Sequence, residues 1–322
     1  KTYYKEDFIA ATMSTELTNT SKLREFVEEL KRLKVEIIRP SINKSFAEFK
    51  SEKNKIYYGL GAIKNVGAEA ISNIISERKK NGVFTSLTDF MNRVSDKDVN
   101  KLQLEGLVKS GAFDEFDQDR NKILVSIPKI IQKIKNINDD KSNNQKNLFE
   151  NITENIDDFN FLDYTKWSKK ELLFEEFKSL GFYISDHPLN EFKEVFDQLN
   201  IHSYKDFLKN EKNEALVAGT IMSIQEKKSA KGTPFAIIKF SDNDGEFEIF
   251  LFADLLIQNR DKIKETESFV LTLQKDNSNS QSSQIRVNIK KIESLNEVMD
   301  KPYSKVTIEL KENYDLDDLK KL

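Results

Sequence analysis

The spacing of apolar residues changes once along the chain, from a period typical of helices to one typical of strands. Residues 20–34 carry apolar side chains every three or four positions, which predicts a helix that Thr20 or Ser21 can cap. From Ala215 onward, apolar and polar residues alternate with a period of two. The pattern therefore predicts a mainly helical part followed by a β part.

Several short helices and one short strand are predicted in the first part. Ser168-x-x-Glu171 is a capping box, and Gly181 ends the helix that this box opens. A strand over 35–38 stops at Pro40. The other predicted helices cover 5–17, 20–34, 66–82, 86–93, 97–109 and 118–137.

The order of elements in the second part is characteristic. The predicted strands cover 215–225, 234–241, 246–252, 267–275 and 284–292, with a helix at 253–264 after the third strand. Three strands, a helix and two strands is the order of an OB-fold, a small five-stranded barrel that binds single-stranded nucleic acid or oligosaccharide. The chain is therefore predicted to be a multidomain α+β protein.

Composition excludes several kinds of site. The chain has no cysteine, which rules out disulfides, a thiolate nucleophile and a zinc ribbon. Its two histidines, His187 and His202, are too few for a transition-metal site, and His187 before Pro188 is predicted to be a packed turn residue. No apolar run is long enough to span a bilayer and no secretory signal is present, so we expect a cytoplasmic protein with no membrane partner.

The net charge of −3 means that any binding to nucleic acid depends on local groups. Ile63-Lys64-Asn65-Val66-Gly67 fits a hairpin between two helices, in which successive backbone N–H groups meet a DNA phosphate at a helix N-terminus. We therefore predict duplex-DNA contacts at Lys64, Asn65, Val66 and Gly67, with Asn65 in the left-handed conformation that Asn tolerates best after glycine. The alternative is that Gly59, Gly61 and Gly67 only allow tight turns while Lys64 is solvated.

An Asn-rich stretch between residues 136 and 160 has too few aliphatic residues to order itself and is predicted to be a loop. Within it, Gln145, Leu148 and Phe149 have the pattern of a docking peptide, in which Leu148 and Phe149 fill an apolar pocket of a partner and Gln145 anchors the start of the peptide. The alternative is that this apolar pair folds back onto the chain's own helices.

Basic and aromatic residues gather near the first turn of the predicted barrel. Lys227, Lys228 and Lys231 are predicted to follow a nucleic-acid backbone while Phe235 stacks on a base. Phe250 and Phe252 share a face by alternation, and we expect that face to be the barrel core.

Acidic pairs give no sign of a catalytic centre. Asp157-Asp158 and Asp317-Asp318 are neighbours in sequence and do not have the arrangement that holds two metal ions. Glu28-Glu29 and Glu175-Glu176 are predicted to lie on solvated helix faces. No catalytic and no metal-binding residue is predicted.

Four stretches together resemble one family: Phe8–Met13, Arg39–Asn43, Gly59–Gly67 and Leu180–Leu189. In their order and spacing, with a docking peptide between the third and fourth and an OB-fold afterwards, they resemble the alpha subunit of bacterial DNA polymerase III, the replicative C-family polymerase. The resemblance covers essentially the whole chain.

The resemblance implies a C-terminal portion of a larger polymerase that extends DNA from nucleoside triphosphates with Mg²⁺. It implies that the palm and its catalytic aspartates lie upstream of Lys1, so that this portion is inactive alone and has no cofactor of its own. The implied partners are duplex and single-stranded DNA, the sliding clamp, which Gln145, Leu148 and Phe149 bind, and other replicase subunits. The implied domains are the end of the fingers (1–55), a helix-hairpin-helix domain (56–135), a flexible clamp-binding segment (136–160), a helical connector (161–212), an OB-fold (213–300) and the start of a tail domain (301–322).

Two positions depart from the family pattern. Ser41 stands where an acidic residue is usual, which can alter a contact in the fingers. Lys146 stands where the clamp motif usually has an aliphatic residue, which should weaken docking. An error-prone C-family relative and an OB-fold scaffold that binds protein remain alternatives.

Overall fold

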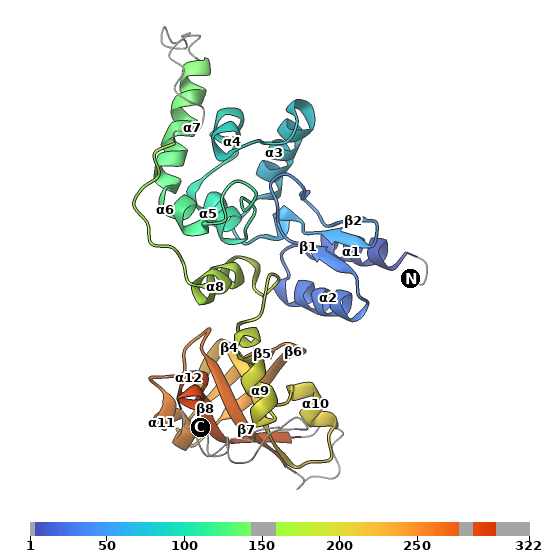
Figure 1. Cartoon of the computed structure of the whole chain (residues 1–322), viewed down its shortest axis with the longest axis vertical. Helices are drawn as coiled ribbons and strands as arrows, with labels where there is room; N and C mark the ends of the chain where they lie inside the picture. The colour runs from blue at the N-terminus through green and yellow to red at the C-terminus, as the bar shows by residue number, and fades with distance from the viewer. Residues whose placement is uncertain (1–3, 143–158, 277–285, 301–322) are drawn as a thin grey trace, which may run out of the picture. The chain divides into compact units, whose positions relative to one another are not determined.

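The computed structural model describes residues 4–142, 159–276 and 286–300. It divides into two compact units, Lys1–Glu191 and Phe192–Leu322, whose elements are labelled in Figure 1. The first unit is mainly helical and the second is built on an antiparallel sheet, so the predicted mixed α+β class is confirmed.

The first unit combines a small sheet with short helices. Its sheet has the strand order β1-β3-β2, with β1 parallel and β2 antiparallel to the central strand. The strands are β1 (Glu36–Ile38), β2 (Lys50–Glu52) and β3 (Lys55–Tyr57). The helices are α1 (Lys5–Thr15), α2 (Thr20–Arg32), η1 (Leu60–Ala62), α3 (Ala68–Asn81), α4 (Leu87–Arg93), α5 (Lys101–Lys109), α6 (Arg120–Val125), α7 (Ile127–Ser142) and α8 (Lys169–Leu180).

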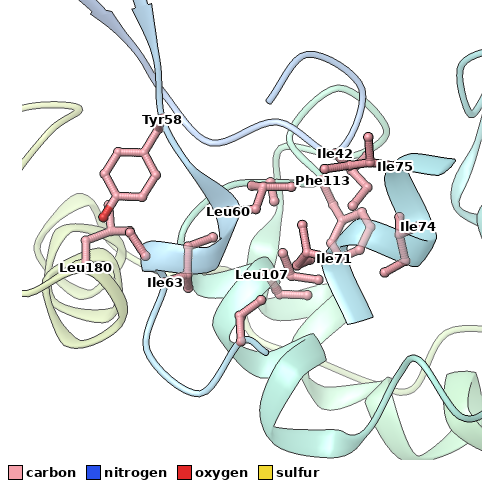
Figure 2. Packing of buried hydrophobic residues seen from close by; sticks show 14 of the residues in the cluster. Ile42, Tyr58, Leu60, Ile63, Ile71, Ile74, Ile75, Leu107, Phe113 and Leu180 are labelled. Carbon is pink, nitrogen blue, oxygen red and sulfur yellow. The ribbon is translucent and has the colours of Figure 1, made fainter. Parts of the chain in front are cut away.

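Side chains from distant segments meet in the core of this unit. Figure 2 shows Ile71, Ile74 and Ile75 of α3 in the same cluster as Leu107 of α5 and Leu180 of α8. Burial of each such aliphatic side chain contributes roughly 1.5–3 kcal/mol to folding. The core therefore fixes α3, α5 and α8 with respect to one another within the unit.

Helix ends follow the sequence in some places and differ in others. The capping box of Ser168 and Glu171 is present, and Gly181 ends α8 in the left-handed conformation at φ 85°. Helix α2, in contrast, is capped by Asn19, whose side chain accepts the N–H of Lys22. The prediction of Thr20 or Ser21 as the cap was wrong by one or two residues. Asn19 is also a favoured capping residue, because its side-chain oxygen can accept a backbone N–H of the first turn.

The last long helix of the first unit extends beyond its predicted end. Residues 118–137 form two helices, α6 and α7, and α7 continues to Ser142 into the stretch that was predicted to be a loop. Two side chains explain this extension, because the Asn138 amide donates to the Val94 carbonyl at 3.2 Å and the Lys141 ammonium donates to the Asn92 carbonyl at 2.6 Å. Tertiary contacts thus override the local composition.

Arg78 is buried although the sequence places it in a basic helix end. Its guanidinium donates to the carbonyl oxygens of Ile42 (2.6 Å) and Ser45 (2.8 Å), and burial lowers its pKa. Arg78 therefore joins the C-terminal half of α3 to the loop before β2 and satisfies two buried carbonyl groups.

Ser41, the position at which the family pattern has an acidic residue, is buried in that same loop. Its hydroxyl oxygen accepts the N–H groups of Asn43 and Lys44 at 3.2 and 3.0 Å. A hydroxyl here closes the turn as an aspartate side chain would.

The carboxylate of Glu176 on α8 is only 1% exposed, so its negative charge needs partners inside the unit. One of its oxygens accepts the N–H groups of Ile184 and Ser185, both at 3.0 Å, and the other lies 3.6 Å from Nη1 of Arg120. The prediction of a solvated face at Glu175-Glu176 was therefore wrong for Glu176. The negative charge also raises the pKa of the buried Tyr58 and Tyr183 hydroxyls, where desolvation is the larger cause.

Arg120, 3% exposed, completes this network. It binds the Asp114 carboxylate through Nε (2.8 Å) and Nη2 (2.7 Å) and donates to the Lys109 carbonyl at 2.9 Å. Bidentate pairing of this kind offsets the cost of removing both charges from water.

The second unit contains a five-stranded antiparallel sheet with the order β6-β5-β4-β7-β8. The strands are β4 (Glu214–Lys228), β5 (Pro234–Asp242), β6 (Gly245–Leu251), β7 (Ser268–Asp276) and β8 (Arg286–Ser294), and the helices are α9 (Lys193–Leu199), α10 (Tyr204–Lys209), α11 (Ala253–Asn259) and α12 (Leu295–Met299). The short helix η2 (Pro188–Phe192) spans the sequence boundary between the two units. The outer strands β6 and β8 contact each other, but no ladder of hydrogen bonds joins them. The sheet is therefore not closed, which is compatible with the predicted OB-like fold, and α11 lies between the third and fourth strands as expected.

No helix in the described parts of the chain combines the length and the apolar character needed to cross a membrane.

We expect Glu176→Ala to lower the free energy of unfolding of the first unit by about 3–5 kcal/mol, because it leaves the Arg120 charge and two backbone N–H groups without their acceptor. Urea denaturation followed by circular dichroism measures this change. The matched control is Glu25→Ala on α2, whose carboxylate forms an exposed pair with Lys22 and should contribute less than about 1 kcal/mol. Equal effects of the two substitutions would show that the buried carboxylate has no special role.

Candidate nucleic-acid interface

The segment between η1 and α3 forms a tight hairpin. Asn65 adopts the left-handed conformation at φ 65°, as the sequence predicted, and the N–H of Val66 donates to the Ile63 carbonyl at 3.1 Å. Gly67 has an ordinary φ of −76° and caps α3 without a side chain. The turn is therefore made by Asn65, and the lack of a Cβ at Gly67 leaves the first turn of α3 open.

The four predicted contact residues are not equally available. Lys64, Asn65 and Gly67 are exposed, whereas the Val66 side chain is buried in the core. The N–H of Lys64 is already bonded to the Ser179 carbonyl at 3.0 Å. Val66 is thus a structural residue, and it supports the hairpin rather than offering a side chain to a ligand.

Several N–H groups at this end of α3 remain without an acceptor. Across the described ranges, the backbone N–H groups of Asn65 and Gly67 donate no hydrogen bond to another backbone group. The first N–H groups of α3, on the exposed Ala68 and Glu69, have no intrahelical partner by the geometry of a helix. Together they form a surface that favours an anion such as a phosphate.

The Lys64 ammonium lies near the C-terminal end of α8. A Cβ built on Gly181 would lie 3.5 Å from Lys64 Nζ, and partial burial lowers the pKa of Lys64. The negative end of the α8 dipole favours a cation at this place. The Lys64 ammonium is therefore held between the hairpin and the C-terminal end of α8.

Helix α5 supports the hairpin from behind. A Cβ on Gly106 would lie 2.8 Å from the Lys64 carbonyl oxygen and 3.1 Å from a Val66 methyl group, so only glycine allows this approach. Gln103 accepts the N–H of Asn100 at 2.9 Å, and its Nε2 lies beside Gly67. Neither residue was predicted from the sequence, although a glycine inside a helical pattern is a known signal of close packing.

Gly59 and Gly61 do more than allow tight turns, which was the alternative interpretation of the glycines around the hairpin. A Cβ on Gly59 would lie 2.8 Å from the backbone of Glu48 and Phe49, and one on Gly61 would lie 2.8 Å from the Ala47 carbonyl. The N–H of Gly61 donates to that carbonyl at 2.9 Å. These glycines allow two backbone segments to approach closely and set the direction from which η1 enters the hairpin.

The predicted clamp-binding residues Gln145, Leu148 and Phe149 lie outside the described residues. The chain on both sides of them is anchored to the first unit. Lys141 is bonded to the Asn92 carbonyl, and Phe159 packs against Phe161 with ring centroids 4.9 Å apart.

In the second unit, the register of the sheet separates the predicted lysines. Lys227 pairs with Phe235 and therefore shares its face of the sheet, whereas Lys228 pairs with Pro234 on the opposite face. Lys231 is exposed in the turn between β4 and β5. The structure thus brings Lys227 together with Phe235 and places Lys228 apart from them.

The expectation that Phe250 and Phe252 form the core was wrong. They are 49% and 61% exposed, while Phe247, Ile249 and Leu251 fill the core from the other face of β6. The Phe250 ring stacks against Phe235 with centroids 6.2 Å apart. Alternation correctly placed Phe250 and Phe252 on one face but could not say which face is buried.

These rings line an open groove of about 1250 Å³ on the second unit. This volume exceeds the roughly 300–1,000 Å³ of pockets that hold a drug-sized ligand. The residues that line the groove include three phenylalanines and several charged side chains, among them Phe235, Phe250, Phe252, Glu248, Asp254 and Arg286. A groove of this size and composition suits an extended chain with planar groups.

No group of three or more His, Asp or Glu side chains within the described residues is arranged to hold a metal ion. These residues therefore do not fit the Mg²⁺ that the resemblance implies for a whole polymerase. Asp157-Asp158 and Asp317-Asp318 lie outside the described ranges. His187 is packed in its turn, accepts the Leu189 N–H at 3.2 Å, and has its pKa lowered to about 4 by burial.

Comparisons with known proteins agree with this geometry. A family described as "Helix-hairpin-helix motif" matches residues 34–123, which contain the hairpin. The DNA polymerase III subunit alpha of Borreliella burgdorferi is 34% identical over 261 residues, covering 79% of this chain and 23% of the relative. That of Helicobacter pylori is 34% identical over 274 residues, covering 78% and 22%.

The subunit alpha of Caulobacter vibrioides is 30% identical over 271 residues, covering 80% of this chain and 23% of the relative. The chain thus spans less than a quarter of the length of these relatives. The aligned part nevertheless includes most of the chain. The chain therefore belongs to the family of the bacterial DNA polymerase III alpha subunit.

Proposed function

We propose that this chain holds DNA and the sliding clamp for a replicative polymerase in the bacterial cytoplasm, alongside other replicase subunits. The observation that carries the proposal is the exposed hairpin at Lys64–Gly67, which opens α3 inside the helix-hairpin-helix match. Extension of DNA with Mg²⁺ is assigned to other parts of the polymerase, and we expect this chain alone to extend no primer.

The hairpin is proposed to grip the backbone of the duplex product. The free N–H groups of Asn65 and Gly67 and the first turn of α3 offer donors to one phosphate, and the Lys64 ammonium adds a charge beside them. None of these contacts reads a base, so the grip is independent of sequence, as a polymerase requires.

The segment around Gln145, Leu148 and Phe149 is proposed to tether the sliding clamp. Phe149 lies seven residues beyond the end of α7 and ten residues before Phe159, both of which belong to anchored parts of the first unit. A peptide that orders only on binding contributes modest and easily exchanged affinity, which suits a processivity contact.

The outer face of β4, β5 and β6 is proposed to hold the single-stranded template. Exposed Phe250 and Phe252 and the half-buried Phe235 offer stacking surfaces, and Lys227 lies on the same face. A scaffold role, with a protein on this face, is the second candidate, because Glu248, Asp254 and Asp276 make much of the groove acidic.

We expect Lys64→Ala to reduce the salt dependence of duplex binding. The slope of log affinity against log salt should fall by about one unit, because one phosphate contact is lost. Fluorescence anisotropy with a labelled duplex between roughly 50 and 200 mM salt measures the slope. The matched control is Lys79→Ala at the far, exposed end of α3, which should leave the slope unchanged. Affinity that does not respond to salt would contradict the phosphate grip.

We expect replacement of both Leu148 and Phe149 by alanine to weaken clamp binding by roughly 30-fold or more, because anchoring apolar side chains contribute about 1 kcal/mol or more each. Surface plasmon resonance with immobilised clamp measures the affinity. Asn144→Ala, outside the motif, is the control, and Lys146→Leu should strengthen binding because it restores an aliphatic second residue. Clamp binding that survives the double replacement would refute the tether.

We expect Phe250→Ala to weaken single-stranded DNA binding by roughly 5- to 100-fold, since stacking on an aromatic side chain contributes about 1–3 kcal/mol per base. Ile257→Ala on α11, also exposed but outside the groove lining, serves as the control. Single-stranded DNA should also protect Lys231 from chemical modification. Absence of both effects would favour the scaffold role.

A further inference from the structure

We propose that the free edge of β6 binds an extended peptide as an additional strand, and that this peptide carries a lysine or arginine with an apolar residue two positions away. The inference rests on the second candidate function, a protein ligand on the second unit, and states the chemistry of that ligand. Strands β6 and β8, labelled in Figure 1, are the two ends of the strand order in this sheet.

The main chain of β6 leaves hydrogen-bonding groups open on its outer edge. The hairpin between β5 and β6 closes at the pair Asp242 and Gly245, and the register continues without a bulge to Leu251. The closing pair of a two-residue hairpin is hydrogen-bonded, so every second residue from Gly245 turns its N–H and C=O groups to β5. The groups of Glu248 and Phe250 therefore point to the other edge, where no backbone partner is present among the described residues.

The side chains of the same two residues lie on the exposed face of β6. Glu248 is exposed, and Phe250 and Phe252 follow it at every second position. In an added antiparallel strand, the residue that bonds to the main chain of Glu248 lies directly opposite it, with its side chain on the same face. The residue two positions away then lies opposite Phe250. One cation and one apolar side chain at this spacing therefore match the edge.

The charges beside this edge favour a cation. The groove is lined by Glu248, Asp254 and Asp276, against Arg286 as the cation among its lining residues in the described ranges. In the part of the chain that the structure describes, the side chains of Glu248 and Asp254 form no hydrogen bond or ion pair. A lysine or arginine of a ligand therefore meets carboxylates that the sheet does not neutralise.

Lys239 does not neutralise Glu248, although it is the cross-strand neighbour of that residue. Its ammonium forms an ion pair with the Glu246 carboxylate at 2.8 Å. The Glu248 carboxylate is thus left to a ligand.

A peptide suits this edge better than a nucleic acid does. The main chain of a peptide supplies an N–H donor and a C=O acceptor at each residue, which match the C=O and N–H groups of Glu248 and Phe250. A phosphate backbone supplies acceptors alone and is repelled by the carboxylates. The groove of about 1250 Å³ also reaches Arg286, Val287 and Asn288 at the start of β8, so it has room for an extended segment.

The first test uses the full chain and a fluorescent peptide of sequence Thr-Lys-Thr-Phe-Thr-Lys-Thr-Val at neutral pH, with binding measured by fluorescence anisotropy. Binding should be saturable, and glutamate in place of both lysines of the peptide should abolish it. The double variant Glu248→Gln and Asp254→Asn should bind the lysine peptide roughly 3- to 30-fold more weakly, the range expected for two exposed ion pairs. Glu265→Gln, exposed and outside the groove, should bind it like the wild-type protein.

The second test separates strand addition from simple attraction between charges. N-methylation of the amides at the lysine and phenylalanine positions of the peptide removes the donors that face β6 and should abolish binding. N-methylation at the threonine positions removes donors that face away and should leave binding intact. Equal affinity of the two methylated peptides would overturn strand addition.

The remaining outcomes distinguish this inference from the proposed function. If the lysine peptide does not bind, while dT12 binds and Phe250→Ala weakens its binding, the inference is overturned and single-strand binding stands. Peptide binding that the Glu248 and Asp254 substitutions leave unchanged overturns it as well. If neither the peptide nor dT12 binds, the inference and both candidate ligands of this face fail together.

Discussion

The buried carboxylate of Glu176 is the interaction on which the first unit depends. Each of its oxygens has a specific partner: one accepts two backbone N–H groups and the other faces Arg120. A charge at such depth is tolerated only when it is paired and hydrogen-bonded. The network therefore leaves one acceptable position for α8 and for the turn that follows Gly181, and it ties both to Asp114 and to the end of α5 through Arg120.

The hairpin at Lys64–Gly67 takes its position from this network. The Ser179 carbonyl, one helical turn beyond Glu176, accepts the Lys64 N–H and holds one side of the hairpin. The missing Cβ of Gly106 lets α5 reach the other side. These two contacts fix the backbone of the hairpin. The N–H groups of Asn65 and Gly67 can therefore remain without an acceptor, because packing elsewhere in the unit offsets the free-energy cost of unpaired donors.

Local chemistry made some of these features predictable from sequence. The capping box at Ser168, the left-handed Asn65 and Gly181, and the succession of strands and helix along the second unit all depend on residues a few positions apart. The burial of Glu176 and Arg78 was missed because their partners lie 8 to 56 residues away. For Phe250 the period was right and the face was wrong, since alternation fixes which side chains share a face, and only the packing of the whole sheet fixes which face meets the core.

The two units present opposite chemistry to a polyanion, although the chain as a whole carries a net charge of −3. At the hairpin the free donors are backbone N–H groups and one ammonium, which suit phosphate oxygens and are indifferent to sequence. On the outer face of β4–β6, exposed rings offer stacking surfaces, while the carboxylates beside them repel phosphates. A phosphate backbone is therefore favoured at the hairpin and disfavoured in the groove, a difference that a uniformly basic surface could not make.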